Sequence, residues 1–380
     1  MKSLYFLVPP YPDLDSSVEL VKVPSLGLYE KESKFFDVDL KSLINPLNLF
    51  EWLSVNTGGF PEPYTFGKRI KHILKRSIDR YDIIHDNQSL AYELIYFQKK
   101  IPLVTTIHHP ISKDLNYQLQ STDEILLKLL MRRWHSFLTM QKFVSKRLKK
   151  IIVPSKSSIE DIRDEFKVSK KKMVRIMNGI DLKIFYPDPK ILKIPKKIVT
   201  VASADVPLKG LDYLLKALKE VKKIYPEVSL SIIGERKKGG HTERLIKKMN
   251  LEKHINFFSN LSQTELRRIY CEAELAVIPS LYEGFGFAAV EAMACGIPLI
   301  STSGGALPEV IKDTGLIIEP KSSKDIYTSI LRFFSSPDLA KKYSEKALKR
   351  VNSKFSWEVI AKKYEEQYFK EIEIYKNANN

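Results

Sequence analysis

The segment from Glu283 to Glu291 combines two carboxylates with a glycine loop, and its residue types suit a phosphorylated ligand. It reads EGFGFAAVE and follows a predicted strand over 275–279. Gly284 and Gly286 let the backbone come close to a ligand, because they carry no Cβ atom. A helix beginning near Phe287 would offer free N–H groups and the positive end of its dipole to an anion. The segment therefore predicts a pyrophosphate site.

Glu291 is charged, whereas the rest of its predicted helix, 287–295, is apolar. A helix that is apolar all round is buried, and a buried carboxylate is costly without a partner. Sugar hydroxyls would be good partners. The alternative is a structural carboxylate that caps a backbone N–H group or pairs with a Lys. The glycine loop between Glu283 and Glu291 favours the first interpretation, because it places one carboxylate on each side of the anion.

Lys209 lies between a predicted strand, 198–202, and a predicted helix, 211–225. A cation at a helix N-terminus opposes the helix dipole. A bound phosphate would remove that conflict and gain a charge-assisted contact. The alternative is a solvated surface Lys, which is common in a chain with a formal net charge of +17.

Two polar clusters follow predicted strands over 82–84 and 101–107 in the first half of the chain. Because parallel strands end at one edge of their sheet, both clusters should lie there. A His at that edge can bind a sugar hydroxyl or a phosphate, or act as a general base; the alternative for each is a loop or core His. No metal-binding spacing occurs, so we predict no metal site. The candidates are His85, Asn87, His108 and His109.

The elements that must position these residues alternate between short β-branched runs and helical stretches. This alternation predicts βα units and parallel sheets. Between 198 and 301, five predicted strands alternate with helices, and a capping box, Ser262-x-x-Glu265, starts one of them. A proline-rich segment over 186–197 indicates a linker. We therefore predict an α/β protein with domains over 1–187 and 188–355 and a final helix over 356–380.

Composition restricts the class of protein. The 380 residues are 44% hydrophobic, which is typical of a globular protein, and two cysteines cannot form a disulfide framework. The sequence has no apolar run long enough to span a bilayer, and the apolar stretch 3–8 is too short for a secretory signal. We expect a cytoplasmic protein.

The segment 125–150 concentrates basic residues and contains no acid. A basic amphipathic helix can lie on an anionic membrane surface, here the inner face of the cell membrane. The alternative is a core helix with a solvated basic face. No nucleic-acid-binding motif accompanies the charge, so nucleic acid is the weaker interpretation.

The stretch EGFGFAAVEAMACGIPLI resembles the signature of the family 4 glycosyltransferases, and the resemblance covers roughly residues 80–375. It implies the GT-B fold, with two Rossmann-like doubly wound domains facing across a cleft and a C-terminal helix returning to the N-terminal domain. It also implies sugar transfer with retention at the anomeric carbon, without a cofactor or a required metal. Further matches are Lys209-Gly210, Asn178-Gly179-Ile180-Asp181, Gly304–Glu309 and Ser356-Trp357.

The resemblance also implies roles for single residues. Glu283 would lie near the donor sugar and His108 at the reacting sugar, which makes these two the catalytic candidates. Glu291 would hold the ribose, and Lys209 the diphosphate. His85, Asn87 and His109 would lie on the acceptor side. The loop residues that would hold the donor are Gly284, Phe285, Gly286 and Phe287.

Two features depart from the family pattern. Many members carry an Arg five or six residues before the motif Lys, where this chain has Ser203 and Ala204. Arg236 or Lys237 could replace that cation. Ser203, which stands at one of the positions of the missing Arg, and Arg236 therefore complete the predicted donor site. Members also begin with a strand, a Gly-Gly loop and a helix. Here Pro9–Pro12 follows the first strand, so the first βα unit is predicted to be missing or replaced.

These observations predict a retaining glycosyltransferase that uses a nucleoside-diphosphate sugar. The acceptor would be a glycan, a lipid-linked glycan or a cell-envelope precursor. One alternative is a GT-B enzyme of another type, such as a nucleotide-sugar epimerase. Another is a non-catalytic protein that keeps the fold and binds a membrane or a polyanion.

Overall fold

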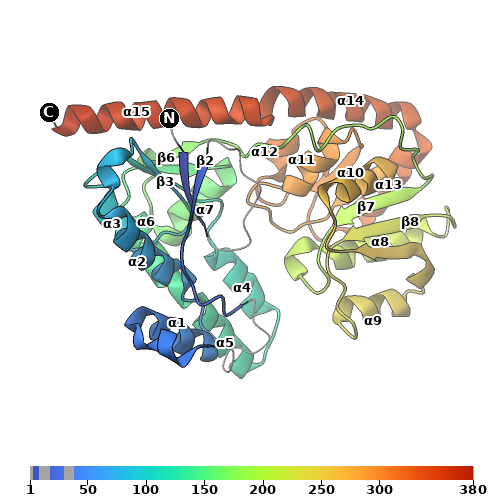
Figure 1. Ribbon diagram of the computed structural model, residues 1–380. Coiled ribbons are helices and arrows are strands. Elements are labelled where there is room, and N and C mark those ends of the chain that lie inside the picture. The colour runs from blue at the N-terminus through green and yellow to red at the C-terminus, as the bar shows by residue number, and fades with distance from the viewer. Residues whose placement is uncertain (1–2, 8–17, 30–37, 380) are drawn as a thin grey trace. The chain divides into compact units, whose positions relative to one another are not determined.

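The structure is a computed structural model that describes residues 3–7, 18–29 and 38–379 (Figure 1). Its contacts divide the chain into two compact units. The N-terminal unit comprises residues 1–152, 160–174 and 367–380, and the C-terminal unit comprises residues 153–159 and 175–366. The proline-rich segment 186–197 thus belongs to the C-terminal unit, where the Ile194 N–H group donates to the Glu272 carbonyl (2.8 Å).

The C-terminal unit contains a six-stranded parallel sheet in the order β12-β11-β10-β7-β8-β9. Counted from β7, this is the 3-2-1-4-5-6 order of the Rossmann fold. The five strands predicted from β-branched runs are present, and β12, with three residues, is additional. The strands are β7 (Lys197–Val201), β8 (Ser229–Ile233), β9 (Ile255–Phe258), β10 (Leu275–Ile278), β11 (Leu299–Thr302) and β12 (Leu316–Ile318).

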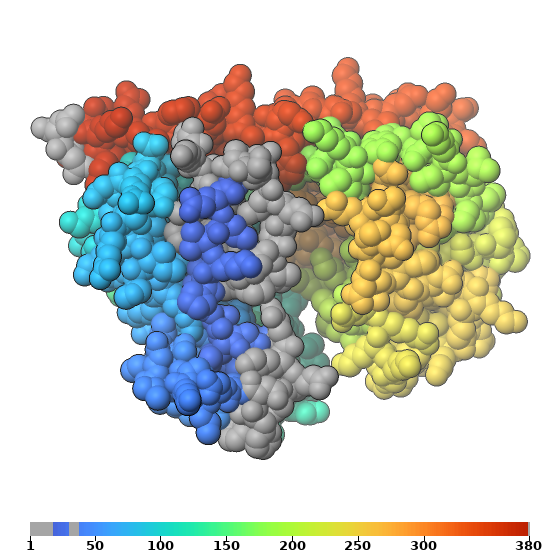
Figure 2. All heavy atoms as spheres, in the orientation of Figure 1, coloured from blue at the N-terminus to red at the C-terminus, as the bar shows by residue number. Residues whose placement is uncertain are grey.

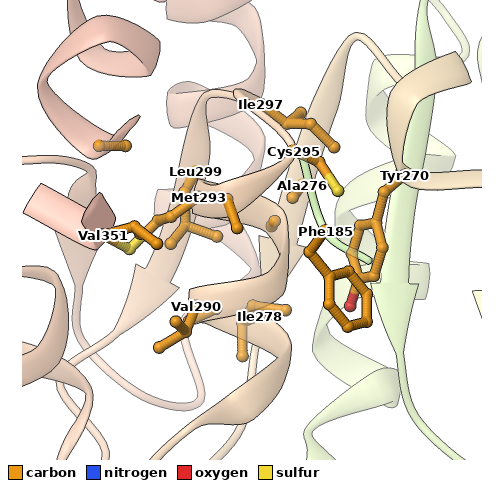
Figure 3. Close-up of a cluster of buried hydrophobic side chains, with 14 of the residues drawn as sticks. Phe185, Tyr270, Ala276, Ile278, Val290, Met293, Cys295, Ile297, Leu299 and Val351 are labelled. Carbon is orange, nitrogen blue, oxygen red and sulfur yellow. The ribbon is translucent and has the colours of Figure 1, made fainter. Parts of the chain in front are cut away.

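Helices cover both faces of this sheet and form two buried apolar clusters. One cluster joins β7 and β8 to α8 and α13, and the other joins β10 and β11 to α10, α11 and α14 (Figure 3). The predicted capping box is confirmed, since Ser262 and Glu265 bond each other's backbone N–H groups. The helices are α8 (Leu211–Val221), α9 (His241–Lys248), α10 (Gln263–Glu272), α11 (Phe287–Ala294), α12 (Leu307–Ile311), α13 (Ser323–Ser335) and α14 (Pro337–Lys354).

The N-terminal unit contains a four-stranded sheet, β3-β4-β5-β6, and a separate parallel pair, β1-β2. The segment Pro9–Pro12, on which the predicted loss of the first βα unit depends, lies outside the described residues. The strands are β1 (Ser3–Leu7), β2 (Val18–Lys22), β3 (Ile84–Asn87), β4 (Leu103–Thr106), β5 (Ile151–Val153) and β6 (Met173–Arg175).

The basic segment 125–150 forms two helices separated by a 3₁₀ turn, η3 (His135–Phe137). Helix α6 buries five residues, among them Leu138 and Val144, and is a core helix. Helix α5 buries none. The helices of this unit are α1 (Pro46–Asn56), α2 (Glu62–Leu74), α3 (Glu93–Phe97), α4 (Ser112–Gln120), α5 (Ile125–Trp134), α6 (Leu138–Ser145) and residues 160–166 of α7 (Lys156–Phe166), whose first turn belongs to the C-terminal unit.

The final helix, α15 (Trp357–Asn379), ends in the N-terminal unit, to which residues 367–380 belong. There the Tyr375 hydroxyl donates to the Lys99 carbonyl (3.3 Å), and Lys150 forms an ion pair with Glu371 (3.6 Å). Within the part of the chain that the structure describes, no helix combines the length and apolarity needed to cross a bilayer.

Candidate active site

The candidate donor site lies where the strand order of the C-terminal sheet reverses. Strands β7 and β10 pair directly, yet the chain continues from β7 to β8 on one side and from β10 to β11 on the other. Open parallel sheets bind ligands at such a point, beyond the carboxyl ends of the strands. The loops that leave these two strands carry Lys209 and Glu283.

A close backbone approach holds the two loops together. The Leu281 N–H group donates to the Leu208 carbonyl (2.8 Å). Gly210 has a positive φ of 64°, and a Cβ atom there would lie 2.0 Å from the Pro279 carbonyl oxygen. Only glycine fits this position, which brings the neighbouring Lys209 against the loop that contains Glu283.

Lys209 and Glu283 form an ion pair, with 2.7 Å between Nζ and Oε1. The Ser280 hydroxyl donates to the same carboxylate oxygen (2.8 Å). Lys209 is therefore paired, which differs from the solvated Lys considered from the sequence. The cation and the carboxylate of the predicted site neutralise each other here, so a ligand phosphate would compete with Glu283 for the Lys209 ammonium group.

The loop after β11 fixes the backbone of Glu283. The Ala306 N–H group donates to the Glu283 carbonyl (2.8 Å). Gly305 has a φ of 64°, and a Cβ atom there would lie 2.3 Å from the same carbonyl oxygen. The segment Gly304–Glu309 thus fixes the backbone that carries the Glu283 carboxylate.

The predicted anion site lies at the start of α11. Its N-cap, Gly286, has a φ of 98°, and a Cβ atom there would lie 2.7 Å from the Leu307 side chain. The Ala289 and Val290 N–H groups donate to the Gly286 carbonyl (3.1 and 3.3 Å). The preceding N–H groups of the helix have no partner within it and can bind an anion. Phe285 is buried and packs edge-on against Phe287.

Two serines that the sequence did not single out fix the orientation of this glycine loop. The Ser155 and Ser158 hydroxyls, at the start of α7, both donate to the Gly284 carbonyl (2.8 and 3.1 Å). Glu309 holds the same helix start, because it accepts from the Lys156 N–H group (2.6 Å). No short motif marks these serines, since their target lies more than 120 residues away in the sequence.

Glu291 accepts a hydrogen bond from the hydroxyl of the fully buried Tyr270 (2.8 Å). The Tyr270 ring belongs to the cluster beside α11 (Figure 3). Burial raises the pKa of Glu291, and the Tyr270 hydrogen bond opposes that rise. Among the described residues no cation forms an ion pair with Glu291. Its partner is a neutral hydroxyl, which leaves hydrogen-bonding capacity for a sugar.

The structure does not bring Arg236 to Lys209. Arg236 is 55% exposed and forms an ion pair with Glu243 on α9. The Ala204 N–H group donates to the Glu235 carbonyl (2.9 Å), so the loop of Ser203 lies beside the loop of Arg236. Arg236 thus lies beside the loop of Ser203, with one guanidinium nitrogen bonded to Glu243.

In the N-terminal unit, the two polar clusters meet. His108 Nε2 lies 2.8 Å from Asn87 Oδ1. Gln88 accepts from the His108 N–H group (2.7 Å) and donates to the His109 carbonyl (3.0 Å). Burial, followed by the electrostatic effect of nearby His109, lowers the pKa of His108, which favours the neutral form of its ring. A neutral ring can donate from one nitrogen and accept at the other.

The sequence predicted that His85 and Asn87 follow a strand, but both lie within β3. The reason is that the strand begins two residues later than expected. His85 places one ring nitrogen 2.6 Å from the Tyr368 hydroxyl and the other 2.7 Å from the Thr106 hydroxyl. Burial, followed by the nearby His108, lowers its pKa to about 4. Both ring nitrogens thus have protein partners, and His85 is suited to position the strand end. His109 contacts Asp114 (2.7 Å).

Comparison with known proteins identifies the family. The model described as Glycosyltransferase Family 4 matches residues 32–184, and that described as Glycosyl transferases group 1 matches residues 187–350. The MMP α-(1→4)-mannosyltransferase of Mycolicibacterium hassiacum is 36% identical over 357 residues, which cover 93% of this chain and 86% of that protein.

Solved structures share the fold. The sucrose-phosphate synthase of Thermosynechococcus elongatus is 21% identical, with a TM-score of 0.71 over 97% of this chain and 88% of that one. The Anabaena protein HepE, solved in complex with UDP-glucose, is 17% identical, with a TM-score of 0.64 over 79% of this chain and 81% of that one. Two parallel-sheet α/β domains, the family matches and the mannosyltransferase relative agree: this chain belongs to the family 4 glycosyltransferases and has the GT-B fold.

Proposed function

We propose that this glycosyltransferase takes its sugar from a nucleoside-diphosphate sugar and transfers it with retention at the anomeric carbon. The observation that carries the proposal is the Lys209–Glu283 pair at the sheet reversal, beside the start of α11. The pair combines a cation that can bind a phosphate with a carboxylate that can accept hydrogen bonds from a sugar. The Anabaena protein solved with UDP-glucose supports a donor of this class.

The chemistry follows from where charge develops. As the bond to the anomeric carbon breaks, negative charge grows on the leaving diphosphate. Lys209 and the N–H groups at the start of α11 can stabilise that charge, because they are already positioned before the reaction begins. When Lys209 moves to the phosphate, Glu283 is released to accept hydrogen bonds from the donor sugar, and Glu291 accepts from the ribose.

On the acceptor side we propose that neutral His108 contacts the reacting sugar, with Asn87 holding its ring. The acceptor is a glycan, a lipid-linked glycan or a cell-envelope precursor. A lipid-linked or envelope acceptor is favoured by α5, an apolar and basic helix without a buried residue.

The test is the thermal stability of the pure protein with UDP-, GDP-, ADP- and TDP-sugars. A donor at about 100 times its Kd should add roughly 2.7 kcal/mol to the free energy of unfolding. Stabilisation by one nucleotide class would identify the base. Proton NMR of the product formed from that donor would then read the anomeric configuration. Stabilisation by none of them would contradict the proposal, and an inverted product would contradict retention.

Replacing Glu291 with Ala should weaken binding of the donor found in that panel by about 10- to 100-fold, the usual effect of losing a charged hydrogen-bond acceptor. The fold should persist, because Tyr270 stays packed in its cluster. Isothermal titration calorimetry measures the affinity. Glu345→Ala, at an exposed position of α14, is the matched control. An unchanged affinity in Glu291→Ala would exclude the ribose role.

A further inference from the structure

Helix α5 exposes its apolar side chains to an unusual degree. Leu126 is 71% exposed, Leu129 is 55% exposed, and no residue of the helix is buried. Contiguous apolar surface of this kind marks an interaction site in a folded protein. The packing of the N-terminal unit therefore does not explain why α5 is rich in Leu.

Six residues of α5 form two parallel rows along the helix, because positions three and four apart share a face. One row is Ile125, Leu129 and Arg132, and the other is Leu126, Leu130 and Arg133. Each row is apolar for its first two positions and ends in an Arg. A helix with this order can bury its leucines in an apolar layer while the guanidinium groups remain at a polar boundary.

Helix α1 and the 3₁₀ turn before it, η1 (Leu40–Ile44), extend the same surface. Arg133 joins the helices by donating to the Ser54 and Thr57 hydroxyls (3.1 and 3.0 Å). Figure 1 shows α1 and α5 at the same end of the N-terminal unit, and Figure 2 shows η1 and α1 at the molecular surface there. We call this surface the α1–α5 face; its exposed apolar residues are Leu40, Ile44, Leu49, Phe50, Leu53, Ile125, Leu126, Leu129 and Leu130.

The charges on the α1–α5 face are mainly positive. Its elements contain four basic residues and one acid, Glu51, which is 2% exposed and forms an ion pair with Arg69. Among the described residues that directly precede these elements in the chain, the exposed acids are Asp39, Asp123 and Glu124. A two-fold contact with a second copy would place two such sets of cations side by side, which opposes self-association. The basic residues of the face are Lys41, Lys128, Arg132 and Arg133.

Arg133 is preorganised to bind an anion. Three hydroxyls hold its guanidinium, those of Ser54, Thr57 and Ser136, and no carboxylate of the described residues forms an ion pair with it. It lines a hollow of about 220 Å³ whose wall combines hydroxyl groups with aromatic rings, among them Phe50 and Phe60. Arg binds phosphate in a defined geometry, because its guanidinium is planar and permanently charged.

We propose that the α1–α5 face docks on an anionic phospholipid bilayer. The leucines of both rows enter the boundary between headgroups and acyl chains, and Arg132 and Arg133 bind lipid phosphates. This deepens the proposed function by placing the enzyme where a lipid-linked or envelope acceptor would be found. The docking itself does not depend on the donor site.

The test is co-sedimentation of the full chain with vesicles of phosphatidylcholine alone and of phosphatidylcholine mixed with phosphatidylglycerol. The wild type should bind the mixed vesicles, and more weakly at high salt. The double variant Leu126→Glu/Leu129→Glu should bind at least about tenfold more weakly, and Arg132→Gln about fivefold more weakly. The control is Leu192→Glu/Ile224→Glu, which adds the same charge in the C-terminal unit at residues 84% and 51% exposed.

Equal loss of vesicle binding in both double variants would overturn the proposal, because net charge alone would then explain binding. Binding of Leu126→Glu/Leu129→Glu at wild-type strength would also overturn it. A third result would also overturn it: light scattering without vesicles shows that the wild type is a dimer and that Leu126→Glu/Leu129→Glu is a monomer. The variant should keep the thermal shift with the donor nucleotide-sugar, which separates a failure of docking from a failure of the proposed function.

Discussion

Replacing Lys209 with Ala is expected to remove most of the stabilisation that the cognate nucleotide-sugar gives the wild-type protein. Lys209 is the cation of the loop after β7, and its ammonium group already lies at the sheet reversal, 2.7 Å from Glu283. Losing a charge-assisted contact to the diphosphate should weaken donor binding by about 10- to 100-fold. Turnover should fall by about 10²- to 10³-fold, because the charge on the leaving group is larger in the transition state.

The measurement combines donor affinity by calorimetry with initial rates at saturating donor. Lys216→Ala is the matched control, since Lys216 is an exposed Lys on α8, the helix that begins just after Lys209. Lys209→Ala also leaves Glu283 without its cation, so Lys209→Ala/Glu283→Gln tests whether an unpaired carboxylate causes the loss. Full donor affinity in Lys209→Ala would rule out the phosphate role.

Replacing Glu283 with Gln should differ from replacing Lys209 in one respect: turnover should again be lost, but donor binding should be kept. Gln has the same shape and can still accept the Ser280 hydrogen bond. Because Lys209 no longer has a competing carboxylate, donor affinity should stay unchanged or increase. Turnover should fall by about 10²-fold, as for removal of a preorganised polar group at the reacting centre.

Rates at saturating donor and the donor Kd of the same preparation distinguish the two outcomes. Glu345→Gln on α14 controls for removal of a carboxylate elsewhere. A large loss of donor affinity with unchanged turnover would assign Glu283 to donor binding alone and would exclude the catalytic role. The two variants together test whether Lys209 binds the donor phosphate while Glu283 acts in the reaction.

Local sequence was sufficient for much of the C-terminal unit. The strands β7 to β11 are short runs rich in β-branched and apolar residues between turns, and the Ser262–Glu265 capping box lies within four residues. The glycine loop before α11 is equally local, because Gly286 must adopt a positive φ at the helix start. Such signals depend on neighbours in the chain, so they can be read without knowing the fold.

The same local patterns were insufficient where packing decides the outcome. The segment 125–150 has a continuous helical pattern, yet η3 interrupts it, and only α6 packs into the core. Strand β12 has three residues, too few to show a period. The pairing of α1 with α5 joins segments almost 80 residues apart and has no sequence signature.

The sequence by itself determined the residue types of the candidate donor site, the succession of strands and helices along the C-terminal unit, and the family. Only the tertiary structure decided which side chains meet. Lys209 reaches Glu283 across 74 residues, and Tyr270 reaches Glu291 across 21. Ser155 and Ser158 bind the Gly284 carbonyl from another part of the chain. Lys209 meets Glu283 because parallel strands bring distant loops to one edge of a sheet, and Tyr270 meets Glu291 because α10 and α11 share one apolar cluster. Spacing along the chain does not encode either proximity.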